Sequence, residues 1–198
     1  LGAFNRPMPH WLDFFNYTMF VDRDGKFQLG MLSTSAFKPL AASMGPMLKE
    51  ESFHLGTGSN GLRRIIKAGV IPLDMLQRYM NKWVATAHDL FGTDSSTSAH
   101  WAYVWGVKGR WDERKKLEGE IEVDKEVLNE ESRGHYHDEI VREVEKLNGY
   151  LPEGCGVTLY VPHENFHRDI GAFGGKKCYT TGELFEGSDE EYAEYLRT

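Results

Sequence analysis

The sequence predicts a mainly α-helical protein with a less regular, partly β C-terminal region. Apolar residues recur three to four positions apart over long segments, which is the spacing of one helix face. Strand-like character is confined to GVTLYV, residues 156–161, and the stretch that follows it is rich in glycine. The segments that we expect to be helical are 9–32, 35–55, 72–91, roughly 124–148 and 188–197.

The first predicted helix, residues 9–32, starts at Pro9, a residue that suits a first helical turn. Its apolar side chains fall on one face, with polar residues between them. Asp24-Gly25 is a turn signal, so it marks a potential break in this helix.

The second predicted helix, residues 35–55, begins at Ser35, which can cap a helix N-terminus. Pro46 lies inside the helical pattern and predicts a kink or a break. The glycine-rich stretch GTGSNG, residues 56–61, follows closely. Its glycines either end the helix or allow a neighbouring segment to pack tightly against it.

The third predicted helix, residues 72–91, has the clearest boundaries. Pro72 stands at its start and Gly92 at its end, which is the usual asymmetry of these two residues around a helix. GTDSSTSAH, residues 92–100, is a loop by composition and the best candidate for a boundary within the chain.

Composition excludes several classes of protein. The chain has 198 residues and a formal net charge of −7, whereas a nucleic-acid-binding protein needs a basic face to neutralise phosphates. No apolar run is long enough to predict a transmembrane helix, and residues 1–20 lack the pattern of a signal peptide. The two cysteines, Cys155 and Cys178, predict neither a disulfide framework nor a metal site. A cytoplasmic location is therefore the expectation.

A possible metal site begins at Glu51 and His54. Residues three apart lie on one face of a helix, and a carboxylate with an imidazole suits iron, manganese or zinc. Di-metal sites in four-helix bundles take a Glu-x-x-His from each of two helices and one carboxylate from each of the other two. Asp22 on the preceding helix fits the single carboxylate, because its distance along the chain suits two antiparallel helices.

These residues also carry a resemblance to a known family. FVDRDGKFQLGML followed by PMLKEESFHLGTG is similar to the second half of the di-iron site in the benzoyl-CoA 2,3-epoxidase family, which is ferritin-like. The similarity runs to about residue 170. The resemblance implies that Asp22, Glu51 and His54 are iron ligands and that Glu50 orients a ligand histidine. It also implies that residues 1–95 form the second half of a ferritin-like helical bundle and that 96–198 form an appended helical and loop region with a short strand.

The other half of the ligand set departs from the family pattern. In the family, a lone Glu and another Glu-x-x-His precede the helix that carries the Asp ligand. They would therefore lie before Leu1, and the chain does not begin with methionine. We expect the chain to be a fragment of a longer oxygenase subunit that is inactive alone.

The resemblance further implies a function. The intact enzyme would be a di-iron monooxygenase that uses O2 to epoxidise the ring of benzoyl-CoA in aerobic aromatic degradation. A separate NADPH-dependent reductase with flavin and an iron–sulfur cluster would supply the electrons. Two alternatives are a sister enzyme acting on phenylacetyl-CoA and a non-enzymatic ferritin-like iron-binding protein that completes its site by dimerisation.

A competing motif, HENFH, spans His163 to His167. It matches the zinc-peptidase pattern, with the two histidines as ligands and Glu164 as general base. Glu164 and His167 also form a second Glu-x-x-His, with Glu131 as a candidate lone carboxylate. The context is poor for both interpretations, because a strand-like segment and Pro162 precede the motif and Gly171 follows it.

Two further groups are candidates for substrate contacts. Basic residues in GLRRIIKAG, namely Arg63, Arg64 and Lys67, could meet the phosphates of a CoA thioester, although they also suit a helix C-terminus. Aromatic residues could line an aryl pocket, although core or interface packing is the more ordinary explanation; they are Trp101, Tyr103, Trp105 and Trp111.

Overall fold

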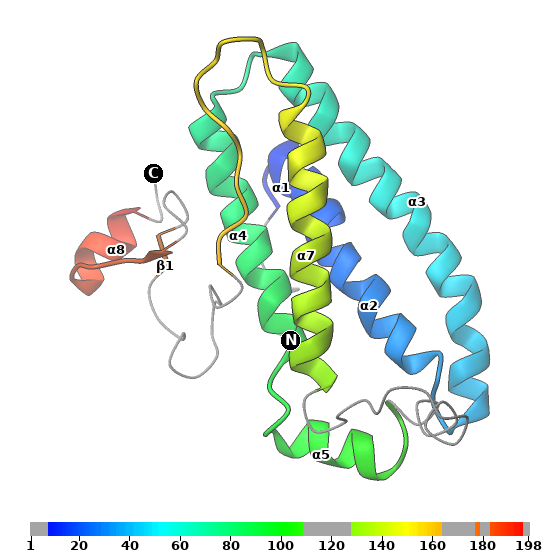
Figure 1. Cartoon of the computed structure of the whole chain (residues 1–198). Helices are drawn as coiled ribbons and strands as arrows, with labels where there is room; N and C mark the ends of the chain where they lie inside the picture. The colour runs from blue at the N-terminus through cyan, green and yellow to red at the C-terminus, as the bar shows by residue number, and fades with distance from the viewer. Residues whose placement is uncertain (1–7, 109–127, 164–176, 179–182, 196–198) are drawn as a thin grey trace.

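The computed structural model describes residues 8–108, 128–163, 177–178 and 183–195. Within these ranges the chain is mainly α-helical, as predicted (Figure 1). The elements are α1 (Trp11–Asn16), the π-helix η2 (Tyr17–Val21), α2 (Asp22–Leu32), α3 (Lys38–Ala68), α4 (Leu73–Phe91), α5 (Thr97–Val104), α7 (Leu128–Asn148), β1 (Lys177–Cys178), β2 (Glu183–Leu184) and α8 (Asp189–Tyr195).

The first predicted helix is a continuous helical run, α1–η2–α2, and Asp24-Gly25 does not break it. The Asp24 carboxylate accepts a hydrogen bond from the Gln28 side chain (3.1 Å), one turn later in the same helix. This bond stabilises the helical conformation where the dipeptide alone would favour a turn. The π-helical turn within the run was not predicted; its defining bond runs from the Asp22 amide to the Tyr17 carbonyl, five residues back.

The second predicted helix is longer than expected. α3 begins at Lys38 and ends at Ala68, and Gly69 follows in the left-handed conformation (φ 64°). Pro46 lies inside α3 without ending it. Of the two roles expected for the glycines in 56–61, tight packing is the one observed, since Gly58 and Gly61 are buried against the α1–η2 run.

The core lies between the N-terminal helical run, α3, α4 and α7. In Figure 1, α3 runs beside α2, and α7 lies between α4 and α2. The bounds predicted for α4 are confirmed, because it spans Leu73–Phe91 between Pro72 and Gly92. Apolar residues of α7 join the same core cluster, so this helix packs onto the N-terminal half; they are Tyr136, Ile140, Val144 and Leu147. The division of the chain near residue 95 stays a prediction.

The prediction of a strand at residues 156–161 is wrong. Within the described ranges this segment pairs with no other strand, and side-chain amides bind its backbone instead. Asn148 exchanges two hydrogen bonds of 2.8 Å with the backbone of Leu159, and Gln77 does the same with Tyr160 at 2.8 and 2.9 Å. Each amide thus satisfies the donor and acceptor that a neighbouring strand would have satisfied. The C-terminal β structure is instead the two-residue antiparallel pair β1–β2.

Among the described helices, none combines the length and the apolar character that a membrane span requires.

Candidate metal centre

Asp22, Glu51 and His54 meet between α2 and α3. One potential ligand atom from each lies within 4.8 Å of the other two. The Nδ1 atom of His54 is 3.5 Å from Glu51 Oε2 and 3.8 Å from Asp22 Oδ2. The Asp22 and Glu51 side chains are 15% and 20% exposed, while that of His54 is 55% exposed. The sequence therefore predicted the convergence of these three residues, and their role as metal ligands stays a prediction.

Two features of local structure bring the three side chains together. Glu51 and His54 are one turn apart on α3, so they project from the same face. Asp22 is the first residue after the π-helical turn, and π turns are frequently found at functional sites. Gly25 faces the cluster, since a Cβ at this position would meet Glu51 Oε1 at 3.6 Å, an ordinary van der Waals contact.

The cluster brings two partly buried carboxylates close together. Burial and the neighbouring charge of Glu51 raise the pKa of Asp22 to about 7, against a smaller opposing effect of His54. The Oε2 atom of Glu51 is buried and accepts no hydrogen bond from the described residues. Two crowded carboxylates and an imidazole are the donor set that iron, manganese or zinc accepts, so the residues present fit a metal ion.

Two further groups of the N-terminal helical run have raised pKa values that the sequence did not predict. Burial raises the pKa of Tyr17, and the charges of Asp22 and Glu51 add to the effect. Burial also raises the pKa of Asp24 to about 7, although Gln28 and Lys108 oppose it. Residues two apart on a helix do not face each other, so the spacing of Asp24 from Asp22 gave no signal, and Asp24-Gly25 indicated only a turn.

The other predicted site residues lie elsewhere or outside the described ranges. Glu50 is exposed on α3 next to Glu51, and its role in orienting a histidine stays a prediction. Of the HENFH motif only His163 is described; Glu164 to His167 lie outside the described residues. Glu131 is exposed in the first turn of α7.

The candidate substrate-contact residues divide into two groups. Arg63 and Lys67 lie over the ring of Tyr150, at 5.8 and 4.7 Å from its centroid, so they have a structural partner. Trp101, Tyr103 and Trp105 are partly exposed on or just after α5, and Trp111 lies outside the described residues. Their proposed contacts with an aryl-CoA stay predictions.

A wide groove lies along α1 and α3, beside the candidate metal centre. Its volume is about 960 Å³, and its apolar walls include Trp11, Phe15 and Phe53. Trp11 and Phe53 are each 69% exposed, which is unusual for large apolar side chains. Phe53 directly precedes His54, so the exposed face of α3 continues into the metal centre.

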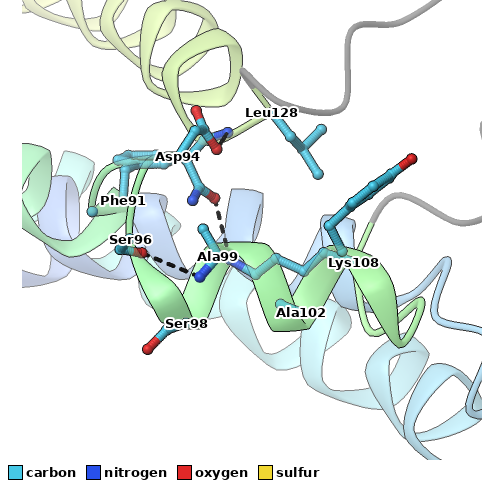
Figure 2. A pocket seen from close by; sticks show the side chains of 11 residues that line it. Phe91, Asp94, Ser96, Ser98, Ala99, Ala102, Lys108 and Leu128 are labelled. Atoms are coloured by element: carbon cyan, nitrogen blue, oxygen red, sulfur yellow. Dashed lines mark hydrogen bonds between the residues drawn. The ribbon is translucent and has the colours of Figure 1, made fainter.

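A smaller hollow of about 270 Å³ lies between α5 and the start of α7 (Figure 2). Its polar groups form hydrogen bonds within the protein. The Asp94 carboxylate accepts hydrogen bonds from the amides of Asn129 and Glu130 (both 2.9 Å), and Ser96 caps α5 by accepting from the Ala99 amide (3.1 Å). Lys108 donates to the Gln28 side chain at 2.8 Å. This hollow is therefore explained by helix capping.

Comparison with known proteins places the chain in a family. The family model described as "Phenylacetic acid catabolic protein" matches residues 1–169. The chain belongs to this family. It is also 35% identical to benzoyl-CoA oxygenase component B of Aromatoleum evansii, over 96% of this chain and 48% of the relative. The resemblance drawn from the motifs is thus confirmed, and the chain spans about half the length of this relative.

Proposed function

We propose that this chain supplies half of the ligands of a di-iron site in an oxygenase that epoxidises the ring of benzoyl-CoA. The observation that carries the proposal is the convergence of Asp22 with Glu51 and His54 between α2 and α3. The similarity to a benzoyl-CoA oxygenase component supports the substrate class.

The proposed site is incomplete within the described part of the chain. A di-metal bundle site needs two Glu-x-x-His pairs and two single carboxylates, and the described residues contain one ligand cluster of three. The exposed His54 and the apolar groove beside it are surfaces on which further helices could pack. We infer that another segment of the oxygenase covers this face and provides the remaining ligands; the greater length of the relative agrees with this.

The described residues also suggest what the protein would do in the reaction. A bound iron pair would supply the chemistry of O2 activation, in which one oxygen atom enters the ring and the other is reduced to water by two reductase-derived electrons and two protons. Asp22 and Glu51 would hold the metal charge, and Asp22 must lose its proton to do so. Met19 and Phe20 are fully buried within the π turn and would exclude water from this side.

A product assay tests the substrate. The oxygenase containing this chain would be combined with an NADPH-dependent reductase, benzoyl-CoA and ¹⁸O2. We expect a ring epoxide with one labelled oxygen atom, and no epoxide when the 198-residue chain is the only oxygenase polypeptide. Epoxidation by this chain with reductase alone would contradict the half-site.

Phenylacetyl-CoA is the second candidate substrate, because the family model is described by phenylacetic acid catabolism. The same assay separates the two, since the preferred thioester gives the higher kcat/KM.

A non-enzymatic iron protein is a further alternative, and the exposed position of His54 supports it. A two-fold dimer that pairs two such faces would join six ligands. Sedimentation velocity with and without Fe²⁺ tests this arrangement, which predicts an iron-dependent dimer that makes no oxygenated product.

A further inference from the structure

The π-helical turn that precedes Asp22 is held by Tyr136 of the distant helix α7 and by Arg23, the residue directly after Asp22. In a π turn the backbone hydrogen-bond register shifts by one residue, so a carbonyl group at the transition to α-helix needs another donor. The carbonyls of Met19 and Phe20, three and two residues before Asp22, both accept hydrogen bonds from side chains.

Tyr136 of α7 supplies the first of these bonds. Its hydroxyl donates to the Phe20 carbonyl at 3.1 Å, and its side chain is fully buried. Phe27 and Phe91 pack against its ring, with centroid distances of 6.0 and 5.3 Å. The ring therefore has little freedom, and the position of its hydroxyl fixes the Phe20 carbonyl relative to α7.

Arg23 supplies the second bond and connects the turn to α7 again. Its Nε donates to the Met19 carbonyl at 3.2 Å, and its Nη1 pairs with the carboxylate of Glu139. Lys26 donates to both oxygens of the same carboxylate, at 2.8 Å each. Glu139 makes the closer of two ion pairs with the largely buried Arg23 guanidinium, the other being Glu143 Oε2 at 3.9 Å from Nη2, and so is its main positional partner.

Tyr136 and Glu139 are three residues apart, so one face of α7 carries both contacts. The backbone segment that they hold ends at Asp22. We propose that Tyr136 directly and Glu139 through Arg23 are positioning residues, which set the place of the Asp22 carboxylate opposite Glu51 and His54. This inference rests on the proposed function of those three residues as metal ligands.

Cobalt titration of the full chain tests the proposal, because the visible spectrum of bound Co²⁺ reports ligand geometry. In Tyr136→Phe and in Glu139→Gln we expect the Co²⁺ dissociation constant to rise about tenfold and the visible bands to shift, as when a group that orients a metal ligand is lost. The matched controls Tyr150→Phe and Glu145→Gln change exposed residues of the same types and should leave both quantities unchanged.

A stability control separates positioning from folding. Ile140→Val removes one buried methyl group of α7 next to Glu139, without touching a hydrogen bond of the π turn. It should lower the melting temperature while leaving the Co²⁺ spectrum unchanged. If Tyr136→Phe fails to fold, Glu139→Gln decides the question, because its side chain is 21% exposed and its loss leaves the apolar core intact.

Three outcomes would overturn the proposal. Wild-type spectra and affinity in both test variants would show that α7 does not position Asp22. Equal spectral changes in Ile140→Val would show a general effect of stability. Retention of Co²⁺ binding in Asp22→Ala would contradict the metal site itself, and so is distinguishable from the first two.

Discussion

Gly58 of α3 lies directly against the backbone of Met19 in the π-helical turn. A Cβ added to Gly58 would stand 2.5 Å from the Met19 amide nitrogen and 2.8 Å from atoms of Thr18. Because most of these atoms belong to the backbone, they cannot rotate away. The contact sets how closely α3 approaches the turn, and thereby how closely Glu51 and His54 approach Asp22.

Gly58→Ala should therefore destabilise the fold by about 2 kcal/mol, as overpacking does at a closed contact. It should also weaken metal binding. Gly56→Ala is the matched control, because a Cβ at Gly56 has no neighbour within 4 Å and alanine favours the helix. Urea unfolding of both variants measures the difference; equal stabilities would contradict the close contact.

Metal affinity should fall as the pH drops below about 7. Asp22 has a raised pKa of about 7, so below that pH a proton must leave before its carboxylate can bind a metal ion. Because a proton and the metal ion compete for the Asp22 carboxylate, metal affinity should fall by about tenfold per pH unit below 7. Titrations with Co²⁺ between pH 5.5 and 8 measure this slope. An affinity that is constant over this range would show that Asp22 is not a ligand.

Without metal, the stability of the fold should decrease as the pH rises, whereas metal affinity increases. The folded pKa of Asp22 lies above the ordinary value of 3.8, so the folded state binds more protons, and its stability falls as the pH rises from about 4 to 7. Asp22→Asn removes this loss and should melt at a higher temperature than wild type at pH 8. The exposed Asp138→Asn is the control and should have no such effect.

Asp13 should contribute strongly to stability. Its fully buried carboxylate accepts hydrogen bonds from Lys82 (2.5 Å) and from the Trp83 indole (3.0 Å), and so ties α1 to α4. Asp13→Ala leaves both donors without this acceptor and should cost about 2 to 4 kcal/mol. Thermal unfolding measures the loss, and a change within 0.5 kcal/mol, of the order expected at exposed sites, would contradict the account.

Local sequence signals were sufficient for α4 and for the candidate ligands. Pro72 and Gly92 mark the ends of α4 by backbone properties that neighbouring elements do not alter. The three-residue spacing of Glu51 and His54 fixes their common face once the segment is helical.

The remaining features depend on contacts between distant segments. α3 continues past residue 55 because Gly58 and Gly61 allow the N-terminal helical run to pack against it, whereas in isolation these glycines resemble a helix end. Residues 156–161 do not form a strand because side chains of Gln77 and Asn148 satisfy the backbone of Leu159 and Tyr160. The π turn is likewise stabilised from α7, and no signal near Asp22 indicates it.

Anaerobic titration with Fe²⁺ tests the central claim most directly. Each of the variants Asp22→Ala, Glu51→Ala and His54→Ala should lose the iron that the wild-type chain binds, while His167→Ala, in the competing HENFH motif, should retain it. Loss of metal in His167→Ala together with full retention in His54→Ala would contradict the account and favour the zinc-peptidase motif.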